Sequence, residues 1–225
     1  KMPEEINRIL TDQISDFLFC PTEASVQNLS NEGFSTKSVN ILKVGDVMQD
    51  AALLFSKSAI PPKVELPEQF ILATLHRAEN TDDPQRLSQI VSALNTLHAS
   101  VSPVVLPLHP RTRKLIAEQG LSLNVHLIDP VGYFEMVWLL GSCSLVLTDS
   151  GGVQKEAFFF NKPCVTMRDQ TEWVELVDIG ANELVGANTA GIIAAAVRSV
   201  GRKVADPHQL YGGGKASMNI VQALD

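Results

Sequence analysis

From residue 69 onward, short apolar runs alternate with amphipathic stretches along the chain. The runs are rich in strand-forming residues, and each is followed by a helical pattern, which is typical of repeated βα units around a parallel sheet. The predicted strands cover residues 69–75, 103–108, 124–128, 144–148, 163–167 and 182–186. Six such strands are enough for a complete parallel sheet of an α/β fold.

The clearest helical pattern follows Asp83 and Pro84, which suit the N-cap and the first turn of a helix. Its apolar positions fall on one face, at Leu87, Ile90, Val91, Leu94 and Leu97. Further helices are predicted over residues 112–119, 132–141, 152–160, 172–179, 188–203 and 214–224. These helices would cover the sheet.

The first 60 residues show the same alternation on a smaller scale. Helices are predicted over 3–14, 22–32 and 46–57, and strands over 16–20 and 39–44. Two strands cannot make a stable doubly wound layer, because a parallel sheet needs both faces covered. We therefore interpret this region as the end of a larger domain. The proline-rich stretch 60–63 is the predicted linker, so residues 1–62 and 63–225 are the two predicted parts.

Composition and charge narrow the class of protein. Of 225 residues, 45% are hydrophobic and 19% charged, which excludes a disordered or fibrous chain. The net charge of −7 argues against a nucleic-acid or anionic-membrane partner, and no apolar run is long enough to span a bilayer. Three widely spaced cysteines indicate buried thiols in a reducing compartment, so we expect a cytoplasmic protein. The first residue is Lys1 rather than Met, which suggests a piece of a longer chain.

The strongest motif is TDSGGVQKE at 148–156, which ends a predicted strand and opens a predicted helix. Ligands of open α/β sheets bind at the carboxyl ends of strands, and a helix N-terminus offers unpaired N–H groups to an anion. Gly151 and Gly152 let a phosphate approach the backbone, and Ser150 adds a hydroxyl donor. Glu156, about one and a half turns into the helix, can accept from a diol such as ribose. For an isolated Ser-Gly-Gly sequence, an ordinary helix cap is the commoner interpretation.

Two further polar clusters follow predicted strands. TLHRAEN at 74–80 holds a histidine and an arginine, which can supply a proton-transfer group and a phosphate clamp. An exposed loop with Arg77 paired to Glu79 is an equally good interpretation. LHPRTRK at 108–114 most simply solvates the first turns of a helix, although His109 and Arg111 could face the same cleft.

Together the three strand ends predict a cleft for an anionic small ligand. Asp149 and Glu156 could instead hold a metal ion. No second acid pair or histidine lies at ligand spacing, so we expect no metal site.

Seven segments, in order and over nearly the whole chain, resemble the non-hydrolysing UDP-N-acetylglucosamine 2-epimerase family. They are MPEEINR (2–8), GDVMQDA (45–51), HRAEN (76–80), DPVGYFEMVWLL (129–140), TDSGGVQKEA (148–157), KPCVTMRDQTEWVE (162–175) and YGGGKAS (211–217). The resemblance implies a glycosyltransferase-B fold of two Rossmann-like domains. Residues 1–62 would then hold the end of the first domain, and residues 63–225 the UDP-binding domain.

The resemblance also implies the reaction. The proton at C2 is removed and UDP is eliminated, which leaves a bound glycal; reprotonation of the opposite face and return of UDP give the manno epimer. This elimination and addition needs no nicotinamide or other cofactor, and the absence of a GxGxxG motif agrees with it.

Site residues follow from the matching motifs. The resemblance implies that His76 contacts the diphosphate or the leaving oxygen, where charge develops as UDP departs. It implies that Ser150, Gly151 and Gly152 bind phosphate, and that Glu156 binds the ribose hydroxyls.

Departures from the family pattern concern the nucleotide. Trp173 stands where many members have an arginine near the diphosphate, so phosphate binding would depend on Arg168 and Arg77, or the sugar nucleotide differs. Val131 stands where a glutamine is common. Met136 replaces a phenylalanine expected to help enclose uracil, and its soft side chain can still pack on the ring.

Glu4 and Arg8 match a catalytic carboxylate and an active-site cation of the family. Residues four apart share a helix face, so both side chains can point into the cleft, although an ordinary surface ion pair would give the same pattern. The family's remaining catalytic carboxylates would precede Lys1. We therefore expect the 225-residue chain to bind UDP weakly at most and not to epimerise.

For the full-length protein we expect an isomerase of polysaccharide biosynthesis that converts UDP-N-acetylglucosamine to UDP-N-acetylmannosamine, and a homodimer. Relatives that act on acetamido-sugar uronates share the TEWVE segment, so a UDP-2,3-diacetamido-2,3-dideoxyuronic acid 2-epimerase is the close second hypothesis. Three less favoured hypotheses are a UDP-sugar-binding module without catalysis, a hydrolysing epimerase and a retaining glycosyltransferase.

Overall fold

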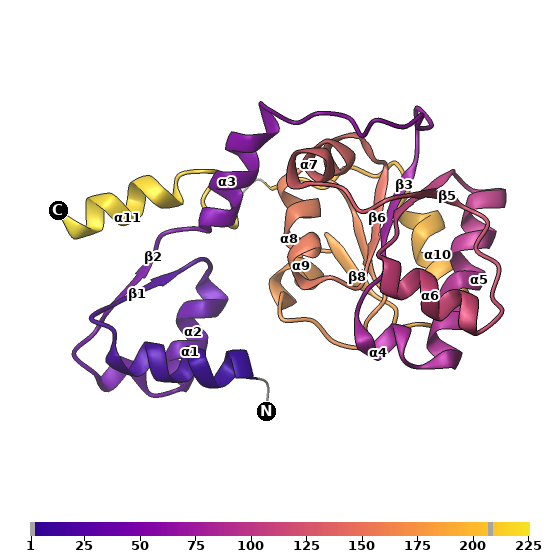
Figure 1. Ribbon diagram of the computed structural model, residues 1–225. Helices are drawn as coiled ribbons and strands as arrows, with labels where there is room; N and C mark the ends of the chain where they lie inside the picture. Colours follow the sequence, from indigo (N-terminus) through magenta and orange to yellow (C-terminus); the bar gives the residue numbers. More distant parts are fainter. Residues whose placement is uncertain (1–2, 207–208) are drawn as a thin grey trace. The chain divides into compact units, whose positions relative to one another are not determined.

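The computed structural model describes residues 3–206 and 209–225 (Figure 1). The chain forms two compact units: unit 1 comprises Lys1–Leu53 and Asp206–Asp225, and unit 2 comprises Leu54–Ala205. The division falls inside helix α3 (Val47–Ser56) rather than at the proline-rich stretch 60–63. The C-terminal segment, which the predicted ranges place with the larger part, belongs to unit 1. Two hydrogen bonds that join this segment to α3 span 166 and 167 positions, so no local sequence pattern predicts them.

Unit 2 is built on one parallel sheet. Its strands are β3 (Ile71–Thr74), β4 (Val104–Pro107), β5 (His126–Ile128), β6 (Leu145–Thr148), β7 (Cys164–Thr166) and β8 (Asn182–Leu184). They pair in the order β5-β4-β3-β6-β7-β8, all parallel. This is the Rossmann order, whose direction of winding reverses between β3 and β6. The predicted strands and the Rossmann-like fold class are confirmed.

Helices cover both faces of this sheet (Figure 1). They are α4 (Ala78–Thr81), α5 (Pro84–Ser100), α6 (Pro110–Glu118), α7 (Tyr133–Ser142), α8 (Gly151–Phe159), α9 (Val174–Asp178) and α10 (Thr189–Ser199). Successive residues of a strand point to opposite faces, so Ile71 joins the core under α5, α6 and α10, whereas Leu72 joins the core under α7 and α8. The predicted helices are confirmed with two differences. Helix α10 ends at Ser199 instead of 203, and the HRAEN segment holds the short helix α4.

Unit 1 contains a smaller parallel sheet. Its elements are α1 (Pro3–Ile14), β1 (Phe17–Cys20), α2 (Glu23–Asn31), the 3-10 helix η1 (Phe34–Thr36), β2 (Asn40–Lys43), the first part of α3 and α11 (Ala216–Leu224). Strands β1 and β2 pair in parallel, with Leu18 opposite Ile41. A small buried cluster beside these strands comprises Leu18, Cys20, Leu29 and Phe34, and Ala52 and Tyr211 are buried elsewhere in the unit.

The C-terminal segment is fixed to α3 and the loop before it. Asp50 accepts hydrogen bonds from Ala216 N (3.1 Å) and Ser217 N (2.7 Å), so it caps α11 from a distant part of the chain. Gly45 has a φ of 96°, and a Cβ there would lie 2.7 Å from the Tyr211 carbonyl oxygen. Only glycine fits this close approach of two backbones.

No helix within the described ranges combines the length and hydropathy of a membrane span. The three cysteines, Cys20, Cys143 and Cys164, are buried and unpaired, as their apolar surroundings predict.

Candidate ligand-binding site

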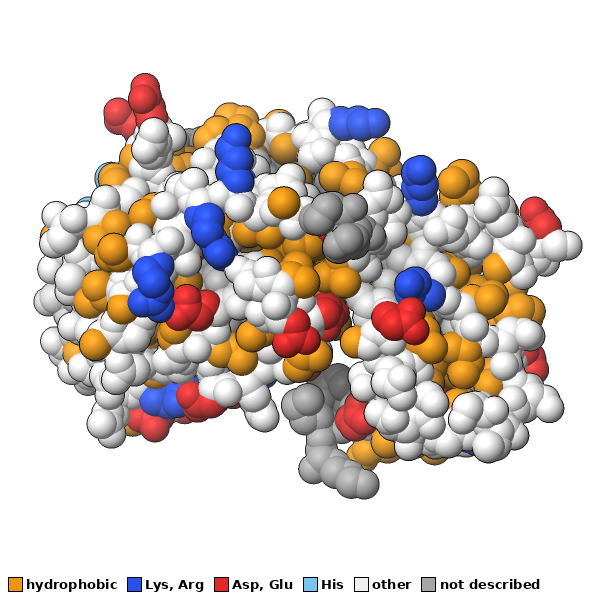
Figure 2. Space-filling view, turned by 180° about the vertical axis from the view of Figure 1, so that it is seen from behind, with side chains coloured by type: hydrophobic (Ala, Val, Ile, Leu, Met, Phe, Trp, Pro, Cys, Tyr) orange, Lys and Arg blue, Asp and Glu red, His pale blue; other side chains and the backbone are white. Residues whose placement is uncertain are grey.

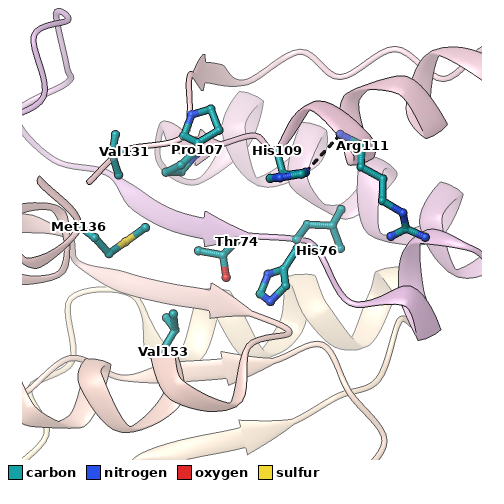
Figure 3. Close-up of a pocket in the computed structure, with 10 residues that line it drawn as sticks. Thr74, His76, Pro107, His109, Arg111, Val131, Met136 and Val153 are labelled. Atoms are coloured by element: carbon teal, nitrogen blue, oxygen red, sulfur yellow. Dashed lines mark hydrogen bonds between the residues drawn. The ribbon is translucent and has the colours of Figure 1, made fainter. Parts of the chain in front are cut away.

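A pocket of about 410 Å³ lies at the carboxyl ends of β3, β4 and β5, beside the start of α8. It therefore sits next to the point where the winding of the sheet reverses, which is where ligands of such sheets bind. The lining residues form a ring around Thr74 (Figure 3). They are Thr74, Leu75, His76, Pro107, His109, Arg111, Pro130, Val131, Met136 and Val153.

A fully buried carboxylate, that of Asp149, fixes the loop after β3. Asp149 Oδ2 accepts hydrogen bonds from the backbone N–H groups of His76 (3.0 Å) and Arg77 (2.9 Å). The His76 side chain turns back to the same group, with Nδ1 3.3 Å from Asp149 Oδ1. A residue at the end of β6 thus holds the His-Arg pair at the end of β3.

Other buried polar groups connect the neighbouring strand ends. Thr74 Oγ1 and Thr148 Oγ1 are 2.6 Å apart, and Thr148 Oγ1 accepts from Ser150 N at 2.9 Å. Asn80 Nδ2 donates to the Met167 carbonyl oxygen at 2.9 Å, which ties α4 to the end of β7. Since these groups are buried and hydrogen-bonded, they hold the pocket rim in one arrangement.

The N-terminus of α8 has a capping residue, Ser150, and free space around Gly152. Ser150 is the N-cap residue, and its Oγ accepts from Val153 N at 3.5 Å. The helix cap is therefore present in the structure, but the Ser150 hydroxyl hydrogen is not used by that contact and can still be donated. A Cβ on Gly152 would meet no atom within 4 Å, whereas one on Gly151 would lie 3.5 Å from Arg77 Nη2. Arg77 and the open helix end thus lie together.

The segment around Trp173 packs on the first turn of α8. Trp173 Nε1 donates to the Gly151 carbonyl oxygen at 2.8 Å, and Lys155 Nζ lies 4.2 Å from the centre of a Trp173 ring. Gln154, which is fully buried, accepts from Thr171 Oγ1 at 2.7 Å. Trp173 therefore packs against the first turn of α8 and holds the backbone of the glycine pair through its hydrogen bond to Gly151.

Arg168 is buried and already paired with two carboxylates. Its Nε lies 3.1 Å from Glu79, and its Nη1 lies 3.1 Å from Glu172. Burial lowers the pKa of Arg168, but the hydrogen bonds and charges of Glu172 and Glu79 outweigh it, so the pKa lies above its usual value. Burial likewise raises the pKa of Glu172, and the bond from Arg168 reverses the direction, so its pKa is lowered. Phosphate binding by Arg168, expected from the sequence, would require one of these pairs to open, whereas Arg77 lies beside the α8 N-terminus. The alternative interpretation paired Arg77 with Glu79, but in the structure the carboxylate of Glu79 pairs with Arg168.

Glu156 lies on α8, and its carboxylate interacts with the Tyr133 hydroxyl at the start of α7. Burial raises the pKa of Glu156, and the Tyr133 hydrogen bond offsets part of that effect. Tyr133 in turn packs edge-on against Phe55, with ring centres 5.8 Å apart. Met136, the expected uracil contact, and Val131, which stands in place of a common glutamine, both line the pocket and pack on the core under α7 and α8.

Of the second histidine cluster, His109 and Arg111 line the pocket. His109 Nδ1 accepts from Arg111 N at 3.2 Å and so caps α6 (Figure 3). Arg113 and Lys114 point outward to Asp129 and Glu118, which is the solvated helix turn that the sequence favours.

Arg8 belongs to unit 1, where it lines a hollow of about 640 Å³. Its guanidinium pairs with Glu5 (2.7 Å), Asp12 (2.7 Å) and Glu32 (2.9 Å). These contacts raise the pKa of Arg8, with the Glu5 hydrogen bond as the largest cause. A surface ion-pair network thus describes Arg8. Glu4 belongs to helix α1, and the structure describes its backbone but not its side chain.

Asp149, Asn80 and Thr74 are the site residues that the sequence did not single out as anchors. For Thr74 and Asp149 the available signal was a polar residue at or just after the end of an apolar strand, since such a group is buried only when it is hydrogen-bonded. Asn80, in α4, had no comparable signal. Among the residues described, no three His, Cys, Asp or Glu side chains are grouped to hold a metal ion.

Comparison with known proteins gives the site its context. A protein of Pseudomonas aeruginosa named UDP-2,3-diacetamido-2,3-dideoxy-D-glucuronate 2-epimerase is 64% identical over 226 residues, covering 100% of this chain. The UDP-N-acetylglucosamine 2-epimerase of Methanocaldococcus jannaschii is 39% identical and covers 99% of the chain. The chain spans 64% of the length of each of these relatives.

Solved structures agree. The crystal structure of the M. jannaschii UDP-GlcNAc 2-epimerase with UDP-GlcNAc and UDP superposes with a TM-score of 0.82 at 40% identity, over 99% of this chain and 64% of that one. The Neisseria meningitidis UDP-GlcNAc 2-epimerase bound to UDP-GlcNAc gives 0.80 at 32% identity, over 99% and 64%. These likenesses confirm the expected fold class of the glycosyltransferase-B type. The family model described as UDP-N-acetylglucosamine 2-epimerase matches residues 1–225, and the chain belongs to that family.

Proposed function

We propose that the protein of which this chain is part is a non-hydrolysing UDP-sugar 2-epimerase whose substrate is UDP-2,3-diacetamido-2,3-dideoxy-D-glucuronate. The observation that carries the choice of sugar is identity. The relative named for this substrate is 64% identical, whereas relatives of Methanococcus maripaludis and Methanocaldococcus jannaschii named for UDP-N-acetylglucosamine are 39–44% identical. Because the chain spans 64% of these relatives, catalysis is proposed for a protein of their full length.

The pocket geometry supports a nucleoside diphosphate as ligand. The N–H groups at the start of α8, the Ser150 hydroxyl and the Arg77 guanidinium are the groups proposed to bind phosphate. Val131 and Met136 offer an apolar surface for the base, and Glu156 offers an acceptor for ribose. Trp173 supports the glycine pair and, in this proposal, does not touch phosphate.

The proposed reaction balances without a redox partner. A carboxylate takes the C2 proton, the C1–O bond breaks with its electron pair on the UDP oxygen, and a C1–C2 double bond forms. His76, which lines the pocket, is the group proposed to stabilise or protonate that oxygen. Protonation of C2 on the opposite face and return of the UDP oxygen to C1 complete the epimerisation. Glu4 and Arg8 remain proposed contributors from the first domain.

A second candidate substrate is UDP-N-acetylglucosamine. The family model carries that name over the whole chain, and the M. jannaschii structure contains that nucleotide. We infer the same chemistry in this case, with a different sugar in the pocket.

The test uses the full-length protein with each nucleotide sugar alone, in D₂O. The expected result is deuterium at C2 and a manno product with UDP still attached, at higher kcat/KM for the uronate. Higher kcat/KM for UDP-N-acetylglucosamine would favour the second candidate. Release of free sugar would instead indicate a hydrolysing enzyme, and no reaction without an acceptor would favour a transferase.

We infer further that the protein acts in the cytoplasm as a homodimer. The three unpaired buried thiols support a reducing compartment. Light scattering of the full-length protein in solution measures the assembly, and a monomeric mass would exclude the dimer.

A further inference from the structure

We propose that Asp149 is a positioning residue that fixes the His76 imidazole as its Nδ1–H tautomer and so reserves Nε2 for the ligand. This inference deepens the proposed function and rests on it for its catalytic meaning. The tautomer itself is a property of the chain that is measurable without any activity.

The two side chains differ in exposure in the way that this role requires. The Asp149 side chain is 0% exposed, whereas the His76 side chain is 49% exposed. Nδ1 of His76 lies 3.3 Å from Asp149 Oδ1. Nε2, on the far side of the ring, is therefore the nitrogen left to reach a molecule in the pocket that His76 lines (Figure 3).

The hydrogen bonds around the carboxylate determine which atom carries the proton. Asp149 accepts from His76 N, Arg77 N and Asn80 Nδ2, at 3.0, 2.9 and 3.4 Å to Oδ2. A carboxylate has no donor of its own, so Nδ1 can approach it favourably only as Nδ1–H. The neutral ring then has its lone pair on Nε2, which can take up a proton and return it to the diphosphate oxygen.

Asparagine at position 149 would reverse this preference. Its single carbonyl oxygen would be used by the two backbone N–H groups, and its NH₂ group would face His76 Nδ1. The ring would then be favoured as the Nε2–H tautomer, with Nδ1 as acceptor. Asp149→Asn therefore keeps nearly the same shape but presents a donor instead of an acceptor to His76 Nδ1.

The first experiment measures the ring nitrogens by long-range ¹H–¹⁵N NMR on this chain at alkaline pH, where the imidazoles are neutral. His76→Gln identifies the His76 signals by their loss. We expect Nδ1–H in the wild type and Nε2–H in Asp149→Asn. Asp83→Asn is the matched control, because Asp83 also accepts two backbone N–H bonds, from Gln85 and Arg86, but only as the cap of α5. An Nε2–H tautomer in the wild type overturns the proposal even if Asp149→Asn fails to fold.

The second experiment is a double-mutant cycle on the full-length enzyme. Asp149→Asn is expected to lower kcat about 10²-fold with KM changed less, and to have no further effect in the His76→Gln background. An equal loss in that background would show that Asp149 acts only through the fold, which overturns the proposal. A wild type without epimerase activity would refute the proposed function while leaving the tautomer measurement valid.

Discussion

The two units show how much a parallel sheet depends on its covering layers. In unit 2, β3 and β6 are buried along their whole length, and core side chains lie on both faces. In unit 1, β1 and β2 are exposed at alternating or end positions, and the buried cluster beside them is small. Both sheets are parallel, so the difference comes from the number of strands and the helices above and below them.

Both units expose large apolar side chains. On unit 1 they include Ile14 (85%), Leu10 (61%) and Phe17 (38%), and on unit 2 they include Leu54 (60%) and Val197 (54%). Hydrophobic side chains also gather on the face shown in Figure 2. Unit 2, which has the larger core, also contains the pocket around Thr74. A rigid sheet edge holds the polar side chains of such a pocket in fixed positions.

The largest expected effect is on stability, from Leu106→Ala in β4 of unit 2. Leu106 is fully buried, so the change should cost about 2–5 kcal/mol, whereas Leu18→Ala in β1 should cost less because its cluster is small. Both tryptophans, Trp138 and Trp173, lie in unit 2, so fluorescence reports this unit and circular dichroism reports both. Urea unfolding should show a shifted fluorescence transition for Leu106→Ala only. Equal shifts would mean that the units unfold together.

Alkaline pH should destabilise unit 2 through its thiols. Burial raises the pKa of Cys143 and of Cys164 from 9.0 to about 12. Above pH 9 the unfolded thiols ionise while the folded ones stay neutral, so stability is lost as pH rises towards 12, by at most about 1.4 kcal/mol per pH unit for each thiol. The check is urea unfolding across this range, with the Cys143→Ala, Cys164→Ala double variant as reference. The same pH slope in that variant would contradict the assignment.

The affinity for UDP should depend on residues of the pocket in unit 2 and not on residues of the hollow in unit 1. Ser150→Ala and Glu156→Ala are expected to weaken UDP binding at least about tenfold, or about 1.4 kcal/mol, in calorimetric titration. Arg8→Ala should leave it unchanged, because Arg8 lies in the other unit and is paired with carboxylates. Ser150→Asn keeps a helix cap and controls for lost helix stability. Wild-type affinity in Ser150→Ala would count against the phosphate site.

The smallest effect is expected at Asp50, which stabilises unit 1 by capping rather than by burial. Asp50→Ala removes the acceptor for Ala216 N and Ser217 N and should cost about 1 kcal/mol. Burial raises the pKa of Asp50, but these hydrogen bonds outweigh it and lower the pKa. The stabilisation is therefore present at neutral pH and is lost as pH falls through the lowered pKa. Hydrogen exchange of the α11 amides measures it, and unchanged protection would show that α11 does not depend on this cap.

The sequence predicted that the polar clusters after three strands lie together, and the structure brings them to one edge of the sheet. The clusters at 74–80, 108–114 and 148–156 meet at one edge because the strands before them are parallel neighbours, a relation that alternating βα units impose. The sequence was a poorer guide to the partners of individual arginine side chains. Arg168 and Arg8 are both paired with carboxylates, and which acid reaches which arginine depends on residues as far apart as Glu79 and Arg168.

The elements, the parallel sheet and the family could all be predicted from the amino-acid sequence, because periodicity, caps and motifs are local properties of the chain. The contacts between distant residues depended on the packed fold. It brought Asp149 to His76 across 73 positions, returned the C-terminal helix to Asp50, and placed Trp173 behind the glycine pair. The physical reason is that a buried polar group takes whichever partner the packed fold brings within hydrogen-bonding distance, and that partner is seldom its neighbour in sequence.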